Sequence, residues 1–377
     1  MGRPAPGRGR QPRRCRLSAF VPSENSAAEL PPELAADLTR QTQTALGLAV
    51  TGWQALAGGT NNRIFRLQTA QGTPLIAKLY HRDQWSRQKR EFGTLFALRG
   101  RGLAGVPAAL FHGEGLGYAV YSFAPGTVPR PAQLTPDQMR RLGAFAAALH
   151  RIEPEGEIAA LPPAISATFS TGQQMRRIEE RLDAFERVAG VPNAPATVRH
   201  LAAELGLRER LGRLVEKVTA GIDPADRERE LPAAARRLSS GDFGAHNLLV
   251  DDRGAITVLD WEWSGWDDPA QLAMGFVAHA GSEGLSAEAA AAFLDAYAAR
   301  ADLSAAEMAR FERAAALIAI EWAATIAGAV APEALAARRF AVSGFDEDAF
   351  VAGIGELVRR RLARASSGMD YRFPRGA

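Results

Sequence analysis

The chain has 377 residues, so it exceeds one typical domain and is long enough to bury a substantial hydrophobic core. Its 45 Lys and Arg residues nearly balance its 42 Asp and Glu residues, and no uninterrupted apolar run is long enough for an expected transmembrane helix. The single cysteine, Cys15, excludes an internal disulfide and a cysteine zinc cluster, and it fits a reducing, cytoplasmic location.

Residues 1–35 are expected to form a disordered basic tail. Its first 17 residues contain six arginines and no acidic residue, but not the apolar run that a secretory signal needs. An arm that binds nucleic acid or a membrane is one alternative, and a start codon placed too far upstream is another. Because the rest of the chain is close to neutral, we expect neither nucleic acid nor a membrane as a partner.

Strand-like patterns dominate residues 36–124, which we expect to form a small β-rich lobe. A turn with two glycines at residues 58–62 precedes a strand-like run at residues 64–67, although glycine pairs mark any tight turn. The next apolar strand, residues 74–80, carries Lys78, whose charge is costly there without a partner. The alternative is an edge-strand lysine that reaches solvent.

One helix is expected in this lobe, at about residues 87–98, and it carries Glu91 as a candidate partner for the lysine. A strand-like run at residues 118–123 follows, and a Pro-Gly turn at residues 124–127 breaks it. This segment is a hinge candidate, and the alternative is a plain edge strand that ends at a turn.

Residues 125–377 read as a mostly helical lobe. Apolar side chains recur at helical spacing in three stripes, and the third is broken near Gly206. His150 ends the first stripe, and we expect it to be a packed or capping side chain. The stripes span about residues 139–149, 178–188 and 201–218, and further helices are expected at about 287–299, 305–327 and 346–363.

The segment that begins at Ser240 carries the most informative pattern. Asp242 lies in a loop and Asn247 follows it, ahead of a short apolar strand, a polar turn and a returning strand that ends at Asp260. Such a hairpin would bring Asp260 beside Asn247, so that two oxygen ligands could meet one hard cation. The alternative is a surface hairpin with acidic ends.

This layout is the one that phosphoryl transfer requires. One carboxylate, here Asp242, orients and deprotonates the attacking hydroxyl, while Asn247 and Asp260 hold magnesium. A lysine held by a helical glutamate contacts the inner phosphates, as Lys78 and Glu91 could. The sequence therefore predicts a phosphotransferase that uses ATP and Mg²⁺ and moves the γ-phosphate by direct in-line transfer.

These residues resemble the aminoglycoside phosphotransferase and choline kinase superfamily, the small-molecule relatives of the protein kinases. Its usual signature is H-G-D-x-x-x-x-N followed by I-D-W/F-E, and the chain matches it at Gly241-Asp242, Asn247 and Leu259-Asp260-Trp261-Glu262. It departs at Ser240, where the signature has histidine, and at Leu272, where an aspartate usually follows the G-D-P turn. The second departure weakens assignment to the antibiotic-modifying branch.

The resemblance implies a bilobal, protein kinase-like α+β fold, with a nucleotide-binding N-lobe at residues 36–124 and a larger helical C-lobe at residues 125–377. The turn at residues 58–62 is similar to the G-G-x-x-N turn of choline kinase-like enzymes, and the backbone of the hinge would bind the adenine edge. The expected nucleotide-binding residues are Gly58, Gly59, Asn62, Lys78, Glu91, Tyr121, Ser122 and Phe123.

The acceptor is expected to be a hydroxyl of an amino alcohol, a sugar or an amino sugar. Trp261, Trp263 and Trp266 lie among acidic residues and could bind a cationic amine by cation–π attraction, although large aromatics more often fill cores. There are two alternatives. One is a catalytically inactive pseudokinase, which the serine at position 240 favours, and the other is an aminoglycoside-modifying resistance enzyme. A protein kinase is disfavoured because no A-P-E activation segment follows Asp260.

Overall fold

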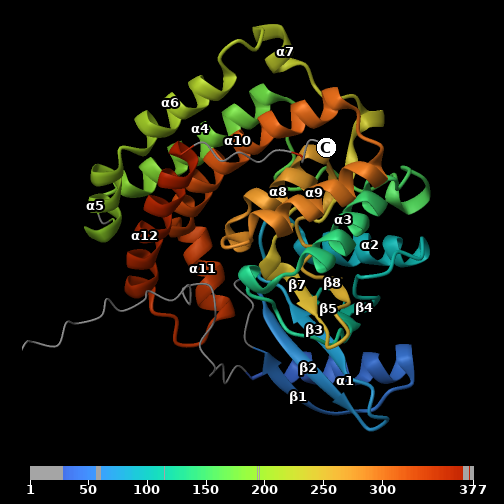
Figure 1. The fold of residues 1–377 in the computed structure, drawn as a ribbon. Coiled ribbons are helices and arrows are strands. Elements are labelled where there is room, and N and C mark those ends of the chain that lie inside the picture. The colour runs from blue at the N-terminus through green and yellow to red at the C-terminus, as the bar shows by residue number, and fades with distance from the viewer. Residues whose placement is uncertain are drawn as a thin grey trace, which may run out of the picture.

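Strands and helices separate into two lobes in the computed structural model of the chain (Figure 1). It describes residues 29–56, 61–113, 115–192, 194, 196–367 and 373. The N-lobe is built on a five-stranded antiparallel sheet in the order β1-β2-β3-β5-β4. Its strands are β1 (Val50–Leu56), β2 (Arg63–Thr69), β3 (Leu75–Leu79), β4 (Ala109–Gly113) and β5 (Tyr118–Ser122).

The two faces of this sheet belong to two different hydrophobic cores. Successive side chains of a strand point to opposite faces, and β5 follows this rule. Tyr118 and Val120 pack in the core under helix α1 (Pro32–Leu46), whereas Ala119 and Tyr121 pack on the side of helix α2 (Arg87–Gly100) and the C-lobe. One face of the sheet therefore looks toward the second lobe.

Helix α1 was not predicted from the sequence. It begins at Pro32, so residues 32–35 of the expected tail are helical, because Leu34 and Leu38 bury their side chains against the sheet. The N-lobe thus has two helices among its described residues instead of the expected one. Residues 1–28, which include the arginine-rich part of the tail and Cys15, lie outside the described residues.

The C-lobe is mostly helical and also holds two short antiparallel strand pairs, β6–β9 and β7–β8. The short strands are β6 (Arg237–Ser239), β7 (Leu248–Val250), β8 (Ile256–Val258) and β9 (Gly265–Asp267). The helices are α3 (Pro136–His150), α4 (Thr171–Gly190), α5 (Ala196–Leu205), α6 (Leu207–Thr219), α7 (Pro224–Glu228), α8 (Pro269–Ala278), α9 (Ala287–Ala301), α10 (Ala305–Ala327), α11 (Pro332–Ala341) and α12 (Glu347–Ser366), with 3-10 turns η1 (Pro131–Gln133), η2 (Gly156–Ile158), η3 (Ala233–Ala235), η4 (Ala245–Asn247), η5 (Ala280–Ser282) and η6 (Gly328–Val330).

Helix α10 connects the two cores of this lobe. Phe311 and Ile318 pack in the core formed with α3, α8 and α9, and Ile320 packs in the core formed with α4, α6 and α12. By length and composition alone, the stretch Ala305–Val330 is the one helix of the described residues that could cross a membrane. Since 61% of its apolar window is buried inside the molecule, it serves as a core helix.

The hinge is tied to the C-lobe immediately after β5. Thr127 and Val250 exchange two backbone hydrogen bonds of 3.0 Å, which join the linker to β7. Gly126 adopts φ +122°, and a Cβ atom there would lie 2.7 Å from the Val250 carbonyl. Only glycine fits this approach, so the linker sets how the sheet and the β7–β8 hairpin face each other.

Candidate active site

The loop after β6 presents Asp242 to a set of hydrogen-bond donors. Asn247 donates its amide to the backbone oxygen of Asp242 at 2.9 Å and to Oδ2 at 3.1 Å. His279 Nε2 lies 2.7 Å from Oδ1, and His246 Nε2 lies 3.4 Å from Oδ2. Burial raises the pKa of Asp242, but the opposite effect of His246 and His279 is larger. The pKa of Asp242 therefore lies well below its ordinary value. The carboxylate is therefore held ionised and oriented.

Gly241 shapes this loop. Its φ is +79°, and a Cβ atom there would lie 2.4 Å from the backbone oxygen of Trp263. The match to glycine in the family signature thus has a physical reason, because the loop passes against the chain that follows Asp260.

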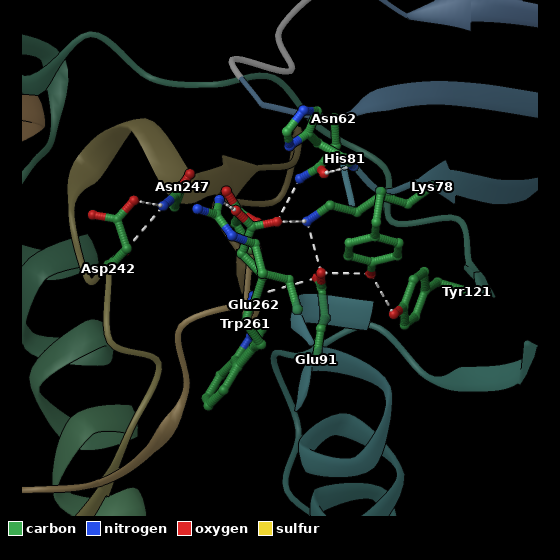
Figure 2. Close-up of polar contacts among 12 residues, drawn as sticks. Asn62, Lys78, His81, Glu91, Tyr121, Asp242, Asn247, Trp261 and Glu262 are labelled. Carbon is green, nitrogen blue, oxygen red and sulfur yellow. Dashed lines mark hydrogen bonds and ion pairs between the residues drawn. The ribbon is translucent and has the colours of Figure 1, made fainter. Parts of the chain in front are cut away.

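Lys78 lies at the centre of a buried cluster of charges. Its Nζ lies 2.7 Å from Glu91, 2.5 Å from Asp260 and 3.3 Å from Glu262, and its side chain is 7% exposed. Burial lowers the pKa of Lys78, but these carboxylates raise it well above its ordinary value overall. Since β3 is the central strand of the sheet, the alternative of an edge-strand lysine that reaches solvent is wrong. Figure 2 shows Lys78 and Glu91 facing each other across the site from Asp242.

The β7–β8 hairpin brings Asp260 back beside Asn247, as predicted. The strands pair in antiparallel register, and Leu259 donates its backbone N–H to the backbone oxygen of Asn247 at 2.8 Å. Asp260 itself has φ +60°, an uncommon conformation that turns the chain toward Lys78. Desolvation and the charges of Glu262 and Glu91 raise the pKa of Asp260 to about 7, against the opposing effect of Lys78.

The donor set of this hairpin fits a magnesium ion. Hard divalent cations take carboxylate and amide oxygens. Asn247 uses its amide nitrogen on Asp242, and its Oδ1 accepts no hydrogen bond from any residue that the structure describes. Asp260 supplies a carboxylate that is one-third exposed, so Asn247 Oδ1 and this carboxylate are the groups that would hold the metal.

Glu262 is a site residue to which the sequence pattern assigned no role. It is 2% exposed, accepts a hydrogen bond from Asn62, and pairs with Arg87 Nη1 at 2.8 Å. Asn62 also accepts the backbone N–H of His81 at 3.1 Å, so its side chain joins the lobes rather than standing free. Its place as the last residue of the Leu259-Asp260-Trp261-Glu262 match is the signal that could have identified it. Gly58 and Gly59 lie outside the described residues.

The three hinge candidates occupy different environments. The Tyr121 hydroxyl bonds to that of Tyr80 at 2.7 Å, and Tyr80 donates to Glu91 at 2.6 Å, so Tyr121 supports the lysine cluster. Ser122 donates its backbone N–H to the backbone oxygen of Ala108 at 2.9 Å. The backbone groups of Phe123 make no hydrogen bond to a described residue, which leaves Phe123 the best candidate to meet an adenine edge.

The tryptophans near Asp260 do not form an open aromatic cage. Trp261 is fully buried and donates its indole N–H to Val258 at 3.0 Å. Trp266 packs against the core of the C-lobe. Trp263 lies against the Arg87 guanidinium at 5.4 Å, so a protein cation already contacts this ring.

Comparison with known proteins identifies the family and the fold. The family model of the phosphotransferase enzyme family matches residues 52–311, and none of the curated proteins matches the chain. A spectinomycin phosphotransferase in complex with ADP and spectinomycin superposes with a TM-score of 0.61 and 14% identity, over 86% of this chain and 98% of that one. A choline/ethanolamine kinase family protein from Mesorhizobium loti superposes with a TM-score of 0.53 and 18% identity, over 89% and 99% of the two chains. A macrolide 2'-phosphotransferase from Brachybacterium faecium does so with a TM-score of 0.54 and 20% identity, over 84% and 97%.

Proposed function

Because the chain belongs to the phosphotransferase enzyme family and is a small-molecule phosphotransferase, we propose that Asp242 is its base and that Asn247 and Asp260 hold its magnesium. Nucleotide use is in keeping with the ADP complex of a fold relative. The observation that carries the proposal is the position of Lys78, which joins Glu91 of the N-lobe to Asp260 of the hairpin. Phosphoryl transfer needs these groups assembled around one nucleotide.

In the proposed reaction, ATP binds between the lobes and Lys78 contacts its inner phosphates. Magnesium bound by Asn247 and Asp260 would neutralise the charge that develops on the phosphates. Asp242 accepts a hydrogen bond from the acceptor hydroxyl, orients its oxygen toward the γ-phosphorus, and takes the proton late. A low pKa suits this role, because such a carboxylate positions the nucleophile and does not remove its proton beforehand.

The acceptor that we propose is a small molecule with a free hydroxyl: an amino alcohol, a sugar or an amino sugar. Fold relatives include a spectinomycin phosphotransferase and choline or ethanolamine kinases, so an aminoglycoside acceptor stays a second candidate. The fully paired cluster around Lys78 favours an active enzyme over a pseudokinase. A cytoplasmic location without nucleic-acid or membrane partners stays a prediction.

A screen of ATP consumption tests this proposal. The purified protein is given ATP and Mg²⁺ with choline, ethanolamine, aminoglycosides, amino sugars and simple sugars, and transfer is verified as a phosphorylated acceptor by mass spectrometry. We expect one chemical class to be phosphorylated, and EDTA to stop the reaction. ATP binding without transfer to any member would favour the pseudokinase, and absence of ATP binding would contradict the nucleotide site.

A further inference from the structure

His279 touches Asp242 from a distant part of the chain. It follows α8, caps that helix and begins η5, and it lies 37 residues beyond Asp242 in sequence. Its residue surface is 5% exposed, so it is a buried side chain that reaches the functional carboxylate.

The hydrogen bonds of this imidazole define its protonation state. Gly281 donates its backbone N–H to Nδ1 at 2.8 Å, so Nδ1 presents a lone pair. The ring proton then resides on Nε2, which lies 2.7 Å from Asp242 Oδ1 and donates to it. Burial lowers the pKa of His279 to about 4, which keeps the ring neutral at physiological pH.

Packing on every side fixes the ring. The indole of Trp322 meets it edge-on with centroids 4.1 Å apart, and His246 stacks on it at 4.9 Å. Arg361 donates to the adjacent Ala280 oxygen at 2.9 Å. The charged and titratable groups that face His279 are thus Asp242, His246 and Arg361.

A second contact links the same segments. The hydroxyl of Ser282, in η5, accepts the backbone N–H of Ala245, in η4, at 3.1 Å, and both residues are fully buried. The turn that carries His279 is therefore joined to the loop that carries Asp242 by two hydrogen bonds. One links the side chains of His279 and Asp242, and the other links the Ala245 backbone to the Ser282 side chain.

Ser240 occupies the position at which the H-G-D-x-x-x-x-N signature has histidine. Its hydroxyl is fully buried and has no hydrogen-bond partner among the described residues. The imidazoles that contact Asp242 come instead from His246, in η4, and from His279, between α8 and η5.

We propose that His279 is a positioning residue of the reaction: its neutral imidazole donates Nε2–H to Asp242 Oδ1 and directs the carboxylate toward the acceptor hydroxyl. This inference rests on the proposed role of Asp242 as the base. His279 takes no proton in the reaction, because its only available lone pair is occupied by the Gly281 N–H. Its effect passes entirely through Asp242.

Enzyme variants test this coupling with ATP hydrolysis, in which water is the acceptor, and with MgATP affinity measured by calorimetry. His279→Phe removes the donor and keeps a ring against Trp322, and His279→Gln restores a neutral donor. We expect His279→Phe to lower kcat about 10- to 100-fold, the usual effect of losing a group that orients another, with the ATP Kd unchanged within about 2-fold. His279→Gln should recover most of kcat, and His150→Phe, which removes another buried histidine, should leave kcat unchanged.

The double variant separates this inference from the proposed function. If His279 acts through Asp242, adding His279→Phe to Asp242→Asn causes no further loss, whereas independent effects would multiply and overturn the inference. Wild-type hydrolysis by Asp242→Asn alone would instead contradict the base. Nitrogen-15 NMR of the histidine rings is a further test, and it uses the wild-type enzyme alone. The signal assigned to His279 should be that of the neutral Nε2–H tautomer at pH 7. A cationic ring or the Nδ1–H tautomer would overturn the proposal.

Discussion

At the scale of single residues, the site depends on charges that are buried only because they are paired. Lys78 meets three carboxylates, and an unpaired charge at its depth would cost several kcal/mol. Asp242 is held by amide and imidazole donors instead, so the two aspartates of the site have opposite shifts. The pKa of Asp242 is lowered overall by its histidine neighbours, whereas burial and two acidic neighbours raise that of Asp260.

Substitution of Asp260 should show this difference. Asp260→Asn keeps the shape of the side chain but removes the charge, so we expect the Mg²⁺ concentration for half-maximal ATP turnover to rise about 10-fold or more. A magnesium titration of turnover measures this, with the exposed Asp252→Asn of the hairpin turn as the matched control. An unchanged magnesium dependence would show that Asp260 is not a metal ligand.

His150 gives a pH-dependent contribution to stability. Burial and the charge of Arg237 lower its pKa to about 4, while the unfolded chain titrates near its ordinary value of 6.5. Between those values the unfolded state binds more protons, so the free energy of unfolding should fall as pH decreases from 6.5 to 4. His150→Phe should flatten this slope in urea denaturation at a series of pH values, and the exposed His200→Phe should not. Equal slopes in all three proteins would refute the assignment.

At the scale of elements, the sequence predicted the helices whose apolar residues recur on one side at helical spacing. Helix α10 has the bounds expected for it, and the break between α5 and α6 falls at Gly206, where φ is +49°. Helix α8 was missed because it is buried nearly all round and shows no polar face that would reveal a helical period. Strands β6 and β9 are three residues each, too short to display alternation.

The same distinction applies to the site. Motif spacing predicted the hairpin that joins Asn247 and Asp260, since turn chemistry is local. His279 could not be found in this way, because its contact with Asp242 exists only through the packing of α8 against the rest of the C-lobe. The sequence motif included Glu262 but indicated no role for it, because its partners Asn62 and Arg87 lie in the other lobe.

The hinge offers a prediction for one element. Gly126→Ala places a Cβ atom 2.7 Å from the backbone of Val250 and imposes φ +122° on alanine, so the linker must move away from β7. We expect a loss of about 2–4 kcal/mol in the free energy of unfolding, together with a higher KM for ATP. Gly284→Ala is the control, because Gly284 has φ +96° and open space around it. Equal losses in the two variants would mean that the contact with β7 has no role.

At the scale of the whole molecule, the lobes meet through a row of polar contacts beside the site. Arg90 donates to the backbone oxygens of Ser264 at 2.7 Å and Pro163 at 2.8 Å, and Ser264 donates to Thr94 at 2.8 Å. Arg63 reaches the backbone oxygen of Phe340, at the end of α11, at 2.7 Å. These contacts hold the sheet over the hairpin, so changes in lobe position should alter nucleotide binding before they alter folding.

Glu262 is a charged interlobe anchor that is buried, with 2% of its surface exposed. Glu262→Gln keeps its hydrogen-bonding shape but removes the charge that pairs with Arg87 and Lys78. We expect ATP to bind about 10-fold more weakly while each lobe keeps its helix content by circular dichroism. Calorimetric titration with MgATP measures the change, and Glu186→Gln, at an exposed position of α4, is its control. Unchanged ATP affinity would argue that Glu262 is merely structural.

The most direct test of the account is the kcat of Asp242→Asn with ATP, Mg²⁺ and the acceptor that the screen identifies, measured beside wild type and Asp252→Asn. If Asp242 is the base, kcat falls about 100- to 10,000-fold, ATP affinity is retained, and Asp252→Asn matches wild type. Wild-type turnover by Asp242→Asn would contradict the central claim, because the reaction would then need no carboxylate at this position.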